Sequence, residues 1–173
     1  AILDGADSLM VTGETAIGKH PIKVIKVLSK VINNTEISIN YGQYSKWSTN
    51  NEINTANAIS HAACAVSRSQ RIGVLATMTH SGYTARMAAR YRPASKIIAL
   101  TPFKKTCRKL AIVWGVSPAL VRDYKSADEI PEVANEELQK LGLIKKGESF
   151  VVTGGVPVGI SGTTNYLTVL TGS

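Results

Sequence analysis

The sequence contains few of the residues that would indicate a disulfide framework, a metal centre or a membrane span. Its two cysteines, Cys64 and Cys107, lie in apolar helical stretches without a CxxC pair, which argues against both disulfide bonds and a zinc site. Its three histidines, His20, His61 and His80, have no metal-binding spacing, so we expect no metal site. No apolar run approaches the roughly 18 residues of a membrane helix, and the N-terminal segment is too charged for a signal peptide. We therefore expect a cytoplasmic protein that does not bind a membrane.

Acidic residues are scarce. Twelve Asp and Glu stand against 20 Lys and Arg, giving a net charge of +8 and a pI near 9.6. Such a surplus favours phosphorylated or polyanionic partners. The basic residues are spread over several predicted helices without an RNP, KH or helix-turn-helix signature, so we do not expect nucleic-acid binding. Arg86, Arg90 and Arg92 lie on or just beyond one predicted helix, where they either bind anions or, as we favour, form a solvated face.

The length and composition predict one globular domain with a short appendage. The chain has 173 residues, 44% of them hydrophobic, which is enough for one sizeable core. The appendage comes first. Its residues 8–11 are typical of a short buried strand, and a helix is predicted from Pro21 to the Asn33–Asn34 pair because apolar residues recur at helical spacing opposite lysines.

A change of composition marks the boundary between appendage and domain. Residues 37–50 are polar and aromatic without a sustained period, which favours a linker. Thr49 and Glu52 form a capping-box pattern at the start of an Ala-rich helix. We therefore place the domain at residues 51–173 and the appendage at residues 1–36.

Within the domain, apolar strands alternate with helices. Nearly continuous apolar strands separated by helices are typical of a parallel sheet covered on both faces. The last two strands are joined by a loop without a helix, so the final strand should run antiparallel. The fold class is α/β, as a three-layer α/β/α sandwich with a mostly parallel five-stranded sheet. Strands are predicted at residues 72–77, 96–100, 116–121, 148–155 and 165–172, and helices at 82–91, from 101 and over 126–142.

The strand-to-helix junction at residues 77–85, TMTHSGYTA, is a candidate phosphate site. In an open α/β sheet such a junction lies at the carboxyl end of a strand, where backbone N–H groups attract anions. Thr79, Ser81 and Thr84 add hydroxyl donors, and Gly82 lets the backbone approach a ligand. An ordinary capped helix is the alternative, because Ser and Thr are common caps. The junction lacks the GK[ST] ending of a nucleotide P-loop.

Two further segments are polar enough to carry function. The loop at residues 154–165, GGVPVGISGTTN, is rich in Gly and hydroxyl residues, and either closes as a lid over a ligand or forms a disordered hairpin tip. Its donors would be Ser161, Thr163 and Thr164. The segment at residues 7–21, DSLMVTGETAIGKHP, is by itself only a polar turn, because one strand end cannot build a catalytic site.

These three segments together resemble the C-terminal third of bacterial-type pyruvate kinases. GADSLMVTGETAIGKHP resembles the signature at the last strand and helix of the catalytic barrel, THSGYTARMAARYRP resembles the effector-phosphate loop, and GGVPVGISGTTN resembles the effector loop. The order is that of the family, and the resemblance covers the whole chain. It implies that residues 1–36 are a remnant of the (β/α)8 barrel and that the rest is the regulatory domain.

The resemblance implies a role for particular residues. An effector phosphate would be bound by Thr79, His80 through its backbone N–H, Ser81, Gly82 and Thr84, with Ser161, Gly162 and Thr164 closing from the other loop. Thr12, where the family has Ser, and Glu14 would belong to an incomplete catalytic site. The Trp and Arg that hold a second phosphate in animal-type enzymes are not evident between Tyr124 and Leu143, which favours AMP or a sugar monophosphate over fructose 1,6-bisphosphate.

The leading hypothesis is therefore an allosteric module. The full-length family member transfers phosphate from phosphoenolpyruvate to ADP with Mg²⁺ and K⁺ and forms a homotetramer, so the remaining pyruvate kinase chain and identical subunits are expected partners. This chain lacks the other barrel strands and should be inactive alone, with no cofactor of its own. The alternative is a stand-alone phosphometabolite-binding module.

Overall fold

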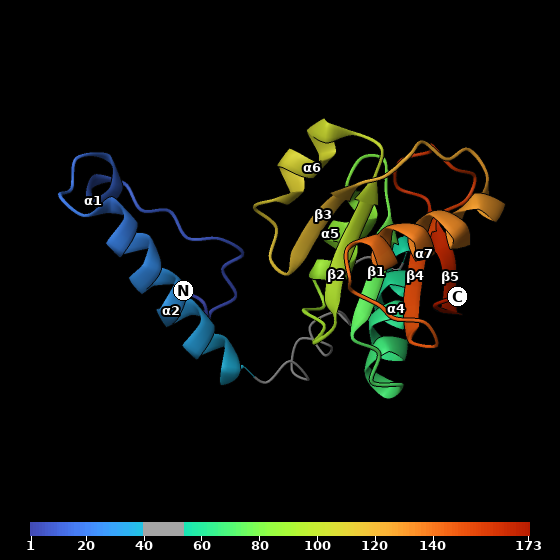
Figure 1. Ribbon diagram of the computed structural model, residues 1–173, viewed down its shortest axis with the longest axis horizontal. Coiled ribbons are helices and arrows are strands. Elements are labelled where there is room, and N and C mark those ends of the chain that lie inside the picture. The colour runs from blue at the N-terminus through green and yellow to red at the C-terminus, as the bar shows by residue number, and fades with distance from the viewer. Residues whose placement is uncertain (40–53) are drawn as a thin grey trace. The chain divides into compact units, whose positions relative to one another are not determined.

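The structure is a computed structural model that describes residues 1–39 and 54–173 (Figure 1). The chain divides into two compact units, with the boundary at residues 40 and 41. Most of the predicted linker, residues 40–50, and the predicted capping pair Thr49 and Glu52 lie outside the described residues.

The smaller unit contains two helices, α1 (Gly13–Ala16) and α2 (Pro21–Ile37). Pro21 occupies the first turn of α2, as predicted, because its missing N–H would have no partner there. The strand predicted at residues 8–11 is wrong, since this segment has no regular structure. No strand is present in residues 1–39, and a lone segment without a partner cannot satisfy its backbone groups as a strand. No residue of α2 is buried.

The larger unit is built on one five-stranded sheet in the order β3-β2-β1-β4-β5. The first four strands of this order are parallel, and β5 runs antiparallel to β4, as the sequence predicts. The lone antiparallel pair arises because β4 and β5 are joined directly by a loop. The strands are β1 (Val74–Met78), β2 (Lys96–Thr101), β3 (Val116–Leu120), β4 (Ser149–Gly155) and β5 (Thr164–Thr171).

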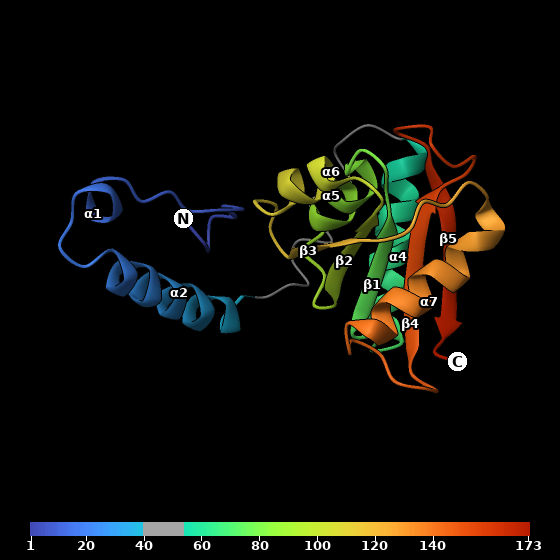
Figure 2. The same ribbon diagram turned by 45° about the horizontal axis from the view of Figure 1, so that its top comes forward.

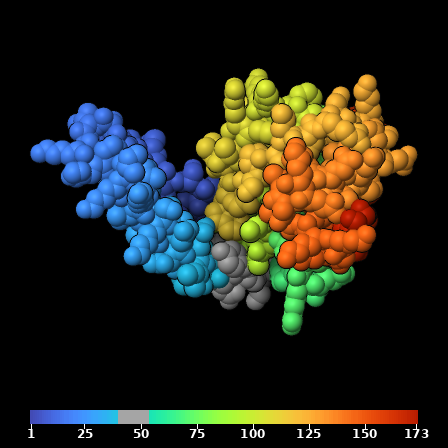
Figure 3. Space-filling model, viewed as in Figure 1, coloured from blue at the N-terminus to red at the C-terminus, as the bar shows by residue number. Residues whose placement is uncertain are grey.

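Helices cover both faces of this sheet, which confirms the predicted three layers (Figure 2). On one face lie α4 (Thr55–Ser69), α5 (Tyr83–Ala89) and α6 (Lys104–Leu110). On the other lies α7 (Ile130–Lys140), which packs on the strands and whose orange atoms face the viewer in Figure 3. A 3-10 turn, η2 (Ala127–Glu129), precedes α7 and carries the predicted capping box.

The core consists of two apolar layers separated by the sheet. Successive strand residues alternate between them: Leu75 and Ile97 pack under α4 and α5, whereas Ala76 and Ile98 pack under α7. Because β1, β3 and β4 are parallel, their carboxyl ends lie at the same edge of the sheet. The loops that follow them are therefore brought together. Within the described residues, no helix is long and apolar enough to cross a membrane.

Candidate functional site

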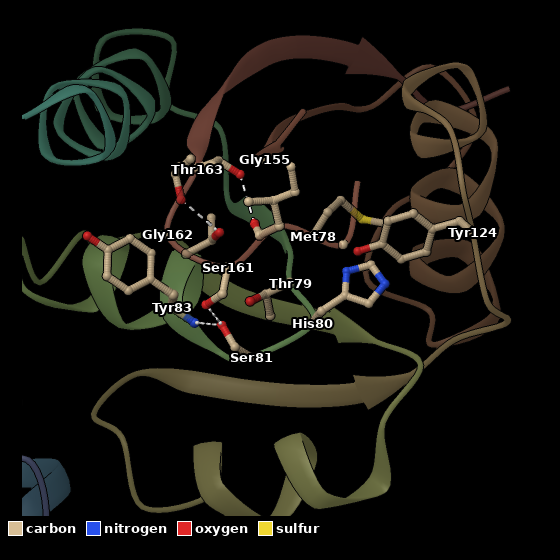
Figure 4. Close-up of a pocket in the computed structure, with 14 residues that line it drawn as sticks. Met78, Thr79, His80, Ser81, Tyr83, Tyr124, Gly155, Ser161, Gly162 and Thr163 are labelled. Carbon is tan, nitrogen blue, oxygen red and sulfur yellow. Dashed lines mark hydrogen bonds between the residues drawn. The ribbon is translucent and has the colours of Figure 1, made fainter. Parts of the chain in front are cut away.

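Three loops at the carboxyl edge of the sheet enclose a pocket (Figure 4). One follows β1 and leads into α5, one follows β3 and leads into η2, and one joins β4 to β5. The lining residues are Met78, Thr79, His80, Ser81, Tyr83, Thr84, Tyr124, Gly155, Gly159, Ile160, Ser161, Gly162, Thr163 and Thr164. All the predicted phosphate-site residues except Gly82 are among them.

The turn after β1 is shaped by its own side chains. The Thr79 hydroxyl accepts a hydrogen bond from the Gly82 backbone N–H at 2.9 Å, so it stabilises the turn. Gly82 has a φ of +88°, which favours glycine, and a Cβ there would lie 3.1 Å from the Leu110 side chain. From α6, the Thr106 hydroxyl donates to the His80 carbonyl at 2.7 Å. Thr79 and Gly82 thus set the backbone conformation that presents Ser81.

Two hydroxyl pairs join this turn to the β4–β5 loop. Ser81 Oγ lies 2.8 Å from Ser161 Oγ at the surface, and Thr84 Oγ1 lies 2.9 Å from Thr164 Oγ1 in the interior. The members of each pair are 80 residues apart in sequence. The space left between the loops is about 20 Å³, room for roughly one water molecule.

The β4–β5 loop is fixed at its base rather than hanging free as a hairpin tip. The Asn165 side chain pairs with the Val156 backbone in both directions: its Oδ1 accepts from the Val156 N–H at 2.8 Å, and its Nδ2 donates to the Val156 carbonyl at 2.6 Å. Within the loop, the Thr163 hydroxyl donates to the Ile160 carbonyl at 2.8 Å. These bonds hold Ser161 against the turn after β1.

The His80 ring packs against aromatic neighbours. It makes tilted contacts with Phe103 and Tyr124, with ring centroids 5.4 and 5.0 Å apart, and its Nε2 lies 4.0 Å from an Asp123 carboxylate oxygen. Burial lowers the pKa of His80, and the Asp123 charge opposes part of that shift. The neutral imidazole is therefore favoured.

Tyr124 is a lining residue that the sequence reasoning did not select. It follows β3, is buried, and its hydroxyl has no hydrogen-bond partner among the described residues. Burial, and secondarily the Asp123 charge, raise the pKa of this hydroxyl. The sequence could have indicated Tyr124, because the residues that follow each parallel strand lie at the same edge of the sheet as Ser81.

The other predicted site residues belong to the smaller unit. Thr12 and Glu14 are exposed in the smaller unit, where the Thr12 carbonyl accepts from the Ala16 N–H at 2.8 Å in the single turn of α1. Across residues 1–39 and 54–173, no three His, Cys, Asp or Glu side chains converge as a metal site would require.

The arginines that were expected to form a solvated face differ from one another. Arg92 is only 5% exposed and lies over the Trp114 ring at 4.8 Å, so the expectation is wrong for this residue. Arg90 is exposed and reaches the Asn57 side chain at 3.5 Å, while Arg86 is half-buried beside Gly82. Because Arg92 lies beyond the end of α5, helical spacing gave no information about its burial.

Comparison with known proteins gives a consistent result. Residues 57–170 match the family described as "Pyruvate kinase, alpha/beta domain". The chain is similar to the pyruvate kinases of Clostridium acetobutylicum, at 37% identity, and Thermotoga maritima, at 40%, each covering 98% of this chain and 36% of the relative. A crystal structure of a pyruvate kinase from Cryptosporidium parvum superposes with a TM-score of 0.87 at 26% identity, over 99% of this chain and 34% of that one. The chain thus spans about a third of the length of the relatives it matches.

Proposed function

This chain belongs to the pyruvate kinase family, and from that premise we propose that its larger unit is an allosteric domain that binds a phosphorylated metabolite. The site is the pocket between the turn after β1 and the β4–β5 loop. The reaction under control is phosphoryl transfer from phosphoenolpyruvate to ADP by the full-length enzyme.

The observation that supports this proposal is the convergence of hydroxyl groups from two distant segments. Ser81 and Ser161 are exposed and in contact, so both can turn toward a phosphate that enters from solvent. A hydroxyl is both a donor and an acceptor, and it donates well to a phosphate oxygen. The net charge of +8 raises the local concentration of such anions.

Regulation requires that the ligand bind two arrangements of the protein with different affinity. The β4–β5 loop supplies an element that can differ between them, because Ser81 and Ser161 are hydrogen-bonded to each other in the arrangement described here. A phosphate that accepts from both hydroxyls must replace this hydrogen bond, and we propose that the two loops move apart when it does. The position of the loop would then depend on whether the ligand is bound, and this difference would change the contacts of the loop with neighbouring parts of the enzyme.

We assign residues 1–36 to the last strand and helix of the catalytic barrel, residues 37–50 to a linker and residues 51–173 to the allosteric domain. Thr12 and Glu14 would complete their function only beside the remaining barrel strands, so this chain alone should be inactive. The full-length enzyme would use Mg²⁺ and K⁺ and assemble as a homotetramer. Across the described residues, no three His, Cys, Asp or Glu side chains converge as ligands for a Mg²⁺ ion.

Binding of phosphorylated ligands to this chain tests the proposal. Thermal unfolding is followed with inorganic phosphate, AMP, ribose 5-phosphate and fructose 1,6-bisphosphate, and a stabilisation of about 2.7 kcal/mol is expected at a hundredfold excess over Kd. S81A and S161A should abolish most of the shift, because both remove an exposed donor at little cost to folding. S69A, at an exposed serine ending α4, is the matched control. Equal ligand shifts in all four proteins would contradict the assigned site.

A further inference from the structure

The Tyr124 hydroxyl is a buried polar group without a protein partner at the wall of the proposed site. Tyr124 is 2% exposed, and no described residue accepts from or donates to its oxygen. Figure 4 shows the ring beside His80, with the hydroxyl directed inward toward Met78 and Gly155. An unmade hydrogen bond in the interior is costly, so its persistence needs an explanation.

Glu129 holds Tyr124 in this position. One Glu129 carboxylate oxygen accepts from the backbone N–H groups of Lys125 and Ser126, at 3.0 and 3.2 Å. The other oxygen pairs with the Arg122 guanidinium at 2.8 Å. These contacts lie on both sides of Tyr124 in sequence, so the loop cannot easily turn the hydroxyl out to water.

The chemistry of this wall favours a ligand hydroxyl as the missing partner. A protonated phenol both donates and accepts one hydrogen bond, which matches an alcohol. Burial raises the pKa of Tyr124, so the group stays protonated at physiological pH.

We infer that Tyr124 determines specificity in the proposed phosphate site by hydrogen-bonding a hydroxyl of a small sugar monophosphate. The inference rests on the proposed function, since the phosphate is held by the serines on the opposite side of the pocket. The space described here holds about one water molecule, so the sugar part reaches the wall formed by Tyr124 only when the loops separate. A hydroxyl of the ligand thereby satisfies the group that the protein leaves unpaired.

The test compares the wild-type chain with Y124F by isothermal titration calorimetry, using ribose 5-phosphate, n-butyl phosphate and inorganic phosphate. Loss of one hydrogen bond should weaken ribose 5-phosphate binding about three- to tenfold. Binding of butyl phosphate and inorganic phosphate, which offer no alcohol, should not change. The ligand-free Tm of Y124F should equal or exceed that of the wild type, because the lost hydroxyl has no described partner.

S81A separates this inference from the function on which it rests. If S81A weakens all three ligands while Y124F leaves ribose 5-phosphate unchanged, the role of Tyr124 is refuted and the phosphate site stands. The same conclusion follows if Y124F weakens all three ligands equally or lowers the ligand-free Tm, because the hydroxyl would then act structurally. If the wild type binds none of the ligands, both proposals fail.

Discussion

The buried pair formed by Thr84 and Thr164 should show strongly non-additive effects on stability. Their hydroxyl oxygens are 2.9 Å apart, and the residues are 5% and 1% exposed. Replacing either threonine by valine keeps the shape but leaves the other hydroxyl buried without a partner, which costs about 1–3 kcal/mol. Replacing both removes the donor and the acceptor together, so T84V/T164V should lose less than either single variant.

Urea unfolding followed by circular dichroism at 222 nm measures this effect. The free energies of unfolding of the wild type, T84V, T164V and the double variant form a double-mutant cycle. The magnitude of its coupling energy should exceed the loss of either single variant, about 1–3 kcal/mol, because the two substitutions compensate each other. T168V is the matched control, because Thr168 lies on the same strand, is half-buried, and should tolerate valine within about 0.5 kcal/mol.

Two results would refute this reasoning. Additive losses in the cycle would mean that the hydroxyls do not depend on each other and that the observed contact adds little. A T168V loss as large as that of T164V would mean that valine itself is disfavoured on β5. In the first case the β4–β5 loop would be held mainly by the Asn165 contacts and the Ser81–Ser161 pair.

Two further predictions concern the loops around the pocket. G82A should lower the free energy of unfolding by about 1–3 kcal/mol, because its φ of +88° is strained for alanine and its Cβ meets Leu110. G115A, at φ +67° with nothing within 4 Å, should lose only the backbone part of this energy when both are measured by urea unfolding. Glu129 has its pKa held below the ordinary value of 4.5 by backbone N–H groups and Arg122, so its contribution to stability is present above pH 4.5 and lost as the pH falls through the lower, folded pKa. Near neutral pH, E129Q should therefore have a lower free energy of unfolding than the wild type. As the pH falls, the wild type should lose this difference, so the two acid unfolding curves should converge.

Much of the fold could be predicted because the relevant information is local. The continuous apolar runs that became β1 and β2 could only be buried on both faces, and helices between them require parallel pairing. The absence of a helix between β4 and β5 predicted the antiparallel pair. The strand prediction at residues 8–11 failed because the relevant information is not local. An apolar run forms a strand only if another strand is available to pair with it, and the local sequence does not show whether one is.

The site was predicted where composition is unusual and missed where it is not. Ser81 and Ser161 occur in Gly- and hydroxyl-rich loops, and the structure brings them together. Tyr124 follows an ordinary strand, and its sequence context does not distinguish it from a core aromatic residue. Only the topology shows that the carboxyl end of β3 lies on the same side of the sheet as the carboxyl ends of β1 and β4. Arg92 is similar, because its burial depends on Trp114, which comes from the segment between α6 and β3.

The direct contact between Ser81 and Ser161 limits how tightly the proposed site can bind phosphate. In the arrangement described here, one of the two hydroxyl hydrogens is used within the pair, so only one remains for a ligand. A phosphate that accepts from both must first break that bond, which costs about 0.5–1.5 kcal/mol, or roughly a three- to tenfold loss of affinity. Any change elsewhere in the enzyme that separates the two loops would remove this cost and strengthen binding. By reciprocity, ligand binding would favour the separated arrangement to the same extent, which is the coupling that an allosteric domain requires.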